Sequence, residues 1–296
     1  MHLAVIIPNL HSPVIDEVIA ALLAQAEETL EVWVVGQDRY GKVPHHPQVH
    51  TLITPTPVFP SVARNLGAAQ VKADAYIFLD ADCIPQAGWL AALLNAWKTY
   101  PDAGAISGAM LPESDDFIQH CGQIANFHEH LVLHPFGERA TLASFSLLVP
   151  YPVWMQSGGF APHLRHTEDI DFTLRLRAQG WRLFFEPRAQ VYHRPSRTGW
   201  RQFWSYARQS GSYSIQTRLR HAQAFAMPVW SRFPLAWRVL APAIAMLRTI
   251  QIYRNTPRLW RYWYAMPAVF FNKLAWCYGA ADGLSIMKTT EEEVKG

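Results

Sequence analysis

The stretch Ala75-Tyr76-Ile77-Phe78-Leu79-Asp80-Ala81-Asp82 decides the fold prediction. Five apolar residues in a row indicate a buried strand, and two carboxylates one residue apart follow it directly. Burying an ionised carboxylate without a partner is costly, so we expect Asp80 and Asp82 at the carboxyl edge of a sheet, where open α/β sheets bind ligands. An extended backbone points both carboxylates to one side, which suits a divalent cation carrying a diphosphate. The alternative is that Asp80 caps a turn and Asp82 begins the next helix.

Around this stretch, strand and helix patterns alternate along the chain. Apolar runs predict strands, and a period of about 3.6 residues predicts helices. The predicted strands are 3–8, 31–35, 49–53, 75–79, 103–110, 142–149, 181–186 and 189–193, and the predicted helices are 14–28, 61–71, 88–99 and 169–179. This alternation favours an α/β fold with a mostly parallel sheet flanked by helices.

The composition is that of a globular protein in a reducing compartment. Of the 296 residues, 50% are hydrophobic and 17% are charged, and the formal net charge of +3 does not indicate a nucleic-acid partner. Cys83, Cys121 and Cys277 are odd in number and lack CxxC spacing, which favours a cytoplasmic location over a disulfide scaffold. The N-terminal apolar run is too short for a signal peptide and lacks a basic start.

Four further motifs accompany the two aspartates. They are Ala63-Arg64-Asn65-Leu66-Gly67-Ala68-Ala69, Gly158-Gly159-Phe160, Thr167-Glu168-Asp169 and Val191-Tyr192-His193. In this order, over roughly residues 1–195, the chain resembles the family 2 glycosyltransferases. The resemblance implies a GT-A fold and an inverting, metal-dependent transferase of the hexosyl type. Such an enzyme moves a sugar from a nucleotide-diphospho-sugar, with a UDP-sugar as the leading candidate, to a glycan or lipid-linked acceptor in polysaccharide or glycoconjugate biosynthesis.

The resemblance also implies roles for the acidic residues. Asp82 and His193 are expected to bind Mn²⁺ or Mg²⁺, and Asp80 to contact the ribose or sugar of the donor. Asp169 is expected to be the general base, and Glu168 to orient Asp169 or the acceptor. Taken without the resemblance, His193 reads better as a partly buried structural histidine.

The position of the predicted base raises a question of acidity. Asp169 falls in the first turn of a helix, where backbone N–H groups stabilise negative charge and lower a carboxyl pKa. A useful base therefore needs desolvation or a nearby acid. Two residues further on, Asp171 is expected to form a structural pair with Arg175, four residues away on the same helix.

The nucleotide side of the site is predicted less completely. The resemblance brings Arg64 near the nucleotide, with a solvated arginine on the helix surface as the alternative. Pro8 and Asn9 end the first strand, where the base would stack. Family members usually have an Asp-Asp-Gly-Ser type of turn after the second strand, whereas this chain has Val35-Gly36-Gln37-Asp38. We expect Asp38 to substitute from a shifted position.

The sequence predicts two domains. Residues 1–198 form the GT-A domain, with a nucleotide-sugar half at 1–110 and an acceptor half at 111–198, and residues 199–296 form a helical, aromatic-rich extension. The span Leu235–Leu247 contains Arg238 and is too short to cross a bilayer. Aromatic residues interleaved with arginine favour peripheral contact with the inner face of the cell membrane. Packing on the catalytic domain, or on a second copy in a homo-oligomer, is the alternative.

Two other functions remain open from the sequence. One is a catalytically silent subunit that binds sugar nucleotides or glycans, against which the intact residues Asp80, Asp82, Glu168, Asp169 and His193 argue. A sugar nucleotidyltransferase is less favoured, because residues 8–13 lack the glycine of its phosphate-binding loop. Processive synthases usually carry a Gln-x-x-Arg-Trp motif, which residues 202–211 do not complete.

Overall fold

The structure is a computed structural model in which residues 1–25 and 29–295 are described, with side chains as far as Met287. The chain divides into two compact units. The first comprises residues 1–114 and 129–196, and the second comprises residues 115–128 and 197–296. The helix at 117–127 therefore belongs to the same unit as the C-terminal helices, although it lies far from them in sequence.

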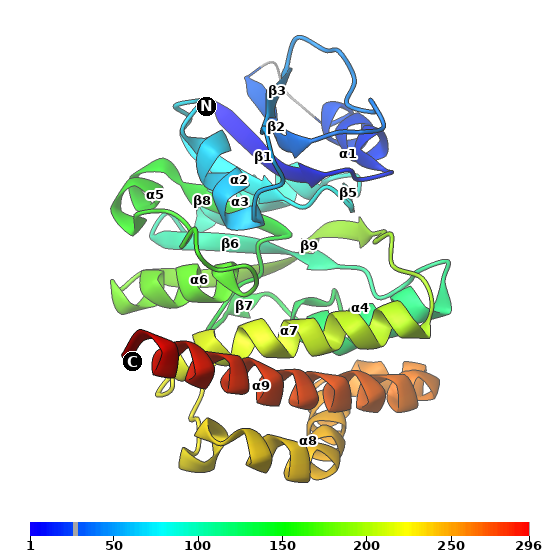
Figure 1. The fold of residues 1–296 in the computed structure, drawn as a ribbon. Helices are drawn as coiled ribbons and strands as arrows, with labels where there is room; N and C mark the ends of the chain where they lie inside the picture. The colour runs from blue at the N-terminus through cyan, green and yellow to red at the C-terminus, as the bar shows by residue number, and fades with distance from the viewer. Residues whose placement is uncertain (26–28, 296) are drawn as a thin grey trace. The chain divides into compact units, whose positions relative to one another are not determined.

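The first unit is built on one mixed sheet, with strand order β3-β2-β1-β4-β8-β6-β9-β5 and β7 paired to β9 (Figure 1). The strands are β1 Leu3–Leu10, β2 Leu30–Gln37, β3 Val49–Ile53, β4 Ala75–Leu79, β5 Cys83–Pro85, β6 Ala103–Met110, β7 Gly137–Glu138, β8 Ser146–Pro150 and β9 Arg182–His193. Strands β1 to β4 are all parallel, β8 runs antiparallel to both of its neighbours, and β6 and β9 are parallel.

In the described part of the first unit, five α-helices accompany this sheet. They are α1 Ile15–Leu23, α2 Pro60–Ala68, α3 Trp89–Thr99, α5 Tyr151–Ser157 and α6 Glu168–Ala178. Helix α2 packs against β1 and β2, and α3 packs against β6 and β9. Strand β4 is buried along its whole length, as its apolar sequence predicts. Its side chains Tyr76 and Phe78 join a core of aromatic rings with Trp154, Phe160 and Phe172.

Some predicted boundaries were wrong. The two predicted strands at 181–186 and 189–193 form one strand, β9, which passes through Pro187. Proline cannot donate a ladder hydrogen bond, and the register between β6 and β9 shifts between Phe185 and Gln190 while pairing continues. Helices α4 and α5 and the short strand β5 were not predicted. The first helix was predicted too long: α1 ends at Leu23, and the predicted end at residue 28 lies outside the described residues.

The second unit is helical, which confirms the predicted C-terminal helical extension. It contains α4 Phe117–Phe127, α7 Trp200–Arg220, η2 Val229–Arg232, α8 Pro234–Asn255, η3 Pro257–Ala265 and α9 Met266–Lys295. Helices α7 and α8 both pack against α9. Glycines allow α7 and α9 to approach closely, because a Cβ added to Gly279 would overlap the carbonyl oxygen of Arg208.

One helix of the described chain, α8, is long and apolar enough to cross a membrane. The sequence prediction of a span that is too short was based on residues 235–247, whereas the helix continues to Asn255. A single helix of this kind also occurs in proteins that have no membrane span, so length and composition alone do not assign it to a bilayer.

Candidate active site

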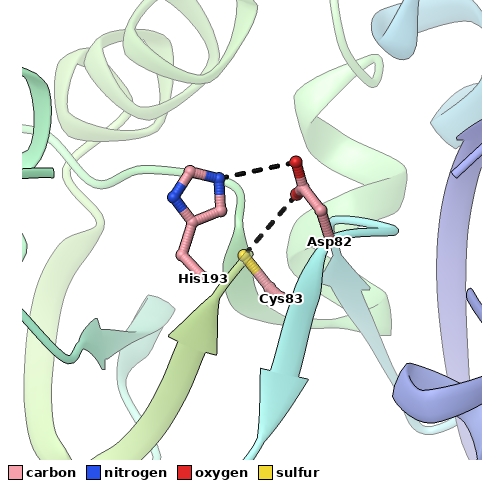
Figure 2. Close-up of side chains that lie close together, drawn as sticks. All are labelled: Asp82, Cys83 and His193. Atoms are coloured by element: carbon pink, nitrogen blue, oxygen red, sulfur yellow. Dashed lines mark hydrogen bonds and ion pairs between the residues drawn. The ribbon is translucent and has the colours of Figure 1, made fainter. Parts of the chain in front are cut away.

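Asp82 and His193 lie side by side at the ends of two strands that are distant in sequence (Figure 2). Strand β5 pairs antiparallel with β9, which sets Cys83 opposite His193. The backbone N–H of Arg194 donates to the carbonyl of Asp82 at 2.8 Å and closes this end of the pair. His193 Nε2 is then 3.5 Å from Asp82 Oδ2.

The Cys83 thiol completes this cluster. Its Sγ is 4.0 Å from Asp82 Oδ1, and the ligand atoms of Asp82, Cys83 and His193 all lie within 4.8 Å of one another. Burial raises the pKa of the Cys83 thiol well above its usual range, and the nearby Asp82 adds to the effect. A carboxylate and an imidazole suit a divalent cation such as Mn²⁺, and a thiol adds a softer donor. The sequence offered Cys83 only as one of three cysteines.

Arg64, on α2, connects the two acidic motifs. Its Nη2 is 2.6 Å from Asp80 Oδ1, and its Nη1 is 2.6 Å from Glu168 Oε1. The residue is only 2% exposed, so a solvated arginine on the helix surface is excluded. Asp80 and Asp82 therefore have different partners: Asp80 pairs with a buried cation, whereas Asp82 faces His193.

The carboxyl group of Glu168 has a raised pKa. Burial raises its pKa to about 7, against the lowering effect of Arg64 and with a further rise from Asp169. Arg64 lowers the pKa of Glu168 and Asp169 raises it, because Asp80, Glu168 and Asp169 share the guanidinium of Arg64. The cation stays charged, and the three carboxylates around it cannot all be fully compensated.

Asp169, the predicted base, stands at the start of α6. Its Oδ2 accepts a hydrogen bond from the backbone N–H of Ser144 at 3.1 Å, and its Oδ1 accepts one from Ile170 at 2.8 Å. These N–H groups and Arg64 lower its pKa, yet burial outweighs them and the net pKa is raised. The desolvation that the sequence argument required of a useful base is thus present.

The segment that donates to Asp169 is held by a histidine that sequence reasoning missed. The backbone N–H of Ala143 donates to His130 Nε2 at 3.2 Å. Burial lowers the pKa of His130 to about 4, with Arg139 lowering it further. The ring is therefore neutral near pH 7 and accepts this hydrogen bond. Nothing in the sequence around His130 marks it, because its role depends on a segment thirteen residues away.

The glycine motif is fixed to α2 and α6. The side chain of Asn65 donates to the Phe160 carbonyl at 2.8 Å and accepts from its N–H at 3.0 Å. Gly159 has φ +75°, and a Cβ there would be 2.9 Å from Asn65 Oδ1, so both backbone and space favour glycine. Arg175 binds the Gly159 carbonyl at 2.6 Å and Asp171 at 2.9 Å, which confirms the predicted Asp171–Arg175 pair.

Two family models match this chain. The one described as "Glycosyl transferase family 2" covers residues 4–141. The one described as "Glycosyl transferase family group 2" covers residues 76–278, which is more than half of the sequence. The chain belongs to the family 2 glycosyltransferases. The predicted resemblance is therefore confirmed.

Among known proteins, this glycosyltransferase is similar to the pre-mycofactocin glycosyltransferase of Mycobacterium tuberculosis. The two are 28% identical over 158 residues, which is 50% of this chain and 33% of that protein. The same similarity holds in two strains of the organism. The chain spans about a third of the length of these curated relatives.

Solved structures share its fold. The mannosyltransferase PcManGT from Pyrobaculum calidifontis, in complex with GDP-Man and Mn²⁺, has a TM-score of 0.60 at 18% identity, covering 92% of this chain and 85% of that one. GalNAc-T7 with UDP, GalNAc and Mn²⁺ has a TM-score of 0.52 at 13% identity, covering 77% and 52%. The likeness confirms the predicted GT-A fold, a mixed α/β architecture with a mostly parallel central sheet flanked by helices.

The remaining predicted residues of the glycosyltransferase lie at the ends of β1 and β2. Asn9 donates to the Gln37 carbonyl at 3.1 Å and accepts from the N–H of Ser12 at 3.0 Å. The Ser12 hydroxyl donates to the carbonyl of Ala81 at 2.6 Å, which ties this loop to the segment between the two aspartates. The Asp38 carboxylate accepts from two N–H groups of its own turn, at 3.2 and 2.9 Å. Pro8 pairs with β2 in the same register.

Proposed function

We propose that this glycosyltransferase moves a sugar, with inversion, from a nucleotide-diphospho-sugar to a hydroxyl of a glycan or lipid-linked acceptor, in polysaccharide or glycoconjugate biosynthesis. The observation that carries the proposal is the meeting of Asp82 and His193 at 3.5 Å, beside a network in which Arg64 joins Asp80 to Glu168. The first pair suits the diphosphate end of a donor. The second holds the carboxylates that face the sugar and acceptor.

Asp82 and His193 would hold the divalent cation, Mn²⁺ or Mg²⁺, with the imidazole favouring Mn²⁺. When bound, such a cation neutralises charge on the leaving diphosphate. Two enzymes of similar fold were solved with Mn²⁺, one with GDP-Man and one with UDP, which supports a nucleotide-sugar donor here. We propose a UDP-sugar as the first candidate.

The donor would lie along the strand ends, with its base near Pro8, Asn9 and Asp38 and its ribose or sugar near Asp80. Arg64 is buried and pairs with Asp80, so we propose that it serves the nucleotide site by orienting that carboxylate.

Asp169 would accept the proton of the acceptor hydroxyl as its oxygen attacks the anomeric carbon. The bond from that carbon to the diphosphate oxygen breaks in the same displacement, and the nucleoside diphosphate leaves with the bonding electrons. The raised pKa of Asp169 supports this role, because a more basic carboxylate takes a proton more readily. Glu168, bonded to Arg64, would keep Asp169 in place.

Calorimetry tests the donor half of the proposal. We expect one nucleoside diphosphate among UDP, GDP and their sugars to bind the full chain tightly with Mn²⁺ and weakly after chelation. Asp82→Ala is expected to abolish the metal-dependent part. Asp16→Ala is the matched control, because Asp16 forms only a half-exposed pair with Lys42 and its loss should leave binding unchanged.

Turnover tests the base. Asp169→Asn is expected to leave donor binding near the wild-type value while lowering the transfer rate by about 10²-fold or more. An active Asp169→Asn variant would show that the base assignment is wrong. Donor binding without any transfer, in wild type and variant alike, would favour the catalytically silent subunit.

A further inference from the structure

Helix α8 of the second unit has one buried side and one exposed apolar side. Its buried residues, among them Trp237 and Ala241, join a core cluster with α9 residues such as Cys277. The exposed large apolar residues of this helix are Leu235, Val239, Leu240, Met246, Leu247 and Ile250, with exposed fractions from 39% to 71%. Leu235, Val239, Met246 and Ile250 are spaced by four, seven and four residues, so they line one face of the helix.

Exposed aromatic side chains flank α8 in the sequence. In η3, directly after α8, Trp260, Trp263 and Tyr264 are 54%, 65% and 46% exposed. Phe233, next to the start of α8, is 54% exposed. Large contiguous apolar patches are rare on monomeric soluble proteins and mark interaction surfaces. Tryptophan and tyrosine are also the side chains that prefer the level of lipid headgroups.

The charge of the surrounding sequence is entirely of one sign. No aspartate or glutamate occurs between Glu186 and Asp282. Within residues 197–281 the cationic side chains are Arg197, Arg201, Arg208, Arg218, Arg220, Arg232, Arg238, Arg248, Arg254, Arg258, Arg261 and Lys273. Arg238 and Arg208 pair with Asp282. The whole chain is nearly balanced, at +3, so positive charge is concentrated in residues 197–281.

We propose that the exposed face of α8, with the aromatic residues of η3, docks on an anionic lipid bilayer and lies in its interface. The apolar side chains would enter the acyl boundary, the tryptophans would lie among the headgroups, and the arginines would pair with lipid phosphates. A protein partner for this face would need a strongly acidic and apolar surface, whereas an anionic bilayer supplies both properties together. Helix α8 packs on α9 through its buried residues, and a helix with one buried side and one exposed apolar side suits contact with the bilayer interface.

Vesicle flotation tests this proposal on the full chain. Vesicles of phosphatidylcholine with and without phosphatidylglycerol are mixed with protein in the absence of nucleotide and metal. We expect binding to the anionic vesicles, at least about tenfold weaker binding to neutral ones, and loss of binding at high salt. Vesicle binding does not depend on the donor site. The membrane proposal can therefore fail while the Asp82→Ala experiment supports the proposed function, and the proposed function can fail while vesicle binding is observed.

A matched pair of variants locates the surface. Val239→Glu places a charge at an α8 side chain that is 68% exposed, and Ile53→Glu does the same at a β3 side chain that is 63% exposed. Both positions are exposed, so both variants should fold, as circular dichroism can verify. We expect Val239→Glu to lower vesicle binding by about tenfold or more and Ile53→Glu to bind as wild type.

Three results would overturn the proposal. Wild-type protein that stays off anionic vesicles has no such surface. Equal binding by Val239→Glu and Ile53→Glu places the contact elsewhere. A wild-type dimer that ignores vesicles and becomes monomeric in Val239→Glu, measured by light scattering, assigns the face to a second copy of the chain.

Discussion

Replacing Arg64 with methionine is the sharpest test of the buried network. The substitution keeps much of the side-chain volume but removes the cation that lies 2.6 Å from both Asp80 and Glu168. Breaking one buried ion pair typically costs about 3–5 kcal/mol, because the remaining charge is left uncompensated. The side chain of Glu168 is 9% exposed and that of Asp80 is 34% exposed. Most of the loss in stability should therefore come from the uncompensated charge of Glu168. We expect the free energy of unfolding to fall by about 3–5 kcal/mol.

The loss should depend on pH in a defined direction. Arg64 lowers the pKa values of Glu168 and Asp169, so its removal raises both further in the folded protein. An acid whose folded pKa exceeds its unfolded pKa keeps a proton that the unfolded chain releases, and stability then falls as pH rises. The variant should therefore lose more stability at about pH 8 than at about pH 5.5.

Denaturant titration of the full chain at both pH values measures this effect, and Arg182→Met is the matched control. Arg182 also bridges two acids, Asp102 at 3.2 Å and Glu138 at 3.3 Å, but its side chain is 46% exposed. Exposed pairs contribute at most about 1 kcal/mol. Equal losses in the two variants, or an Arg64→Met variant that is more stable at the higher pH, would refute the reasoning.

Three further substitutions, the last with a matched control variant, probe the site and the second unit. Glu168→Gln should flatten the fall in stability between about pH 5 and pH 7 that the raised pKa of Glu168, about 7, produces in wild type, as denaturant titrations can measure. His130→Ala removes the acceptor for the Ala143 N–H, and steady-state kinetics should show a lower kcat with donor affinity unchanged. Gly279→Ala should lower the free energy of unfolding by about 2 kcal/mol or more, because the added methyl group overlaps a carbonyl of α7. Gly122→Ala is its control: the added methyl group would have no neighbour closer than 3.7 Å, so this variant should be neutral or stabilising. Thermal unfolding compares the two variants.

The elements that follow from local pattern were predictable. The apolar run 75–79 is strand β4 with the predicted bounds, and the spacing of Asp171 and Arg175 gave a pair that the structure contains. Both depend on residues near each other in sequence. The local pattern failed at β9, where it predicted two strands, 181–186 and 189–193, but pairing with β6 on one side and β5 on the other keeps the strand continuous.

The functions of single polar residues were much less predictable. Arg64 looks like any arginine of an amphipathic helix, and its burial is set by two carboxylates sixteen and 104 residues away. Cys83 joins His193 only because β5 and β9 pair. Sequence patterns report which face of an element is apolar, but not which distant polar groups that face will meet.

The pKa of Asp169 shows how local sequence and distant contacts can act in opposite directions. Its place in the first turn of α6 predicts a lowered pKa, and the structure contains the N–H donors behind that expectation. The net shift in its pKa is nevertheless upward, because the residue is desolvated and the nearby cation, Arg64, is already bonded to Asp80 and Glu168. A guanidinium shared among three carboxylates leaves a negative balance, and a further negative charge is then costly. The basicity proposed for Asp169 is therefore a property of the whole buried cluster, and we expect it to change whenever one member of that cluster is neutralised.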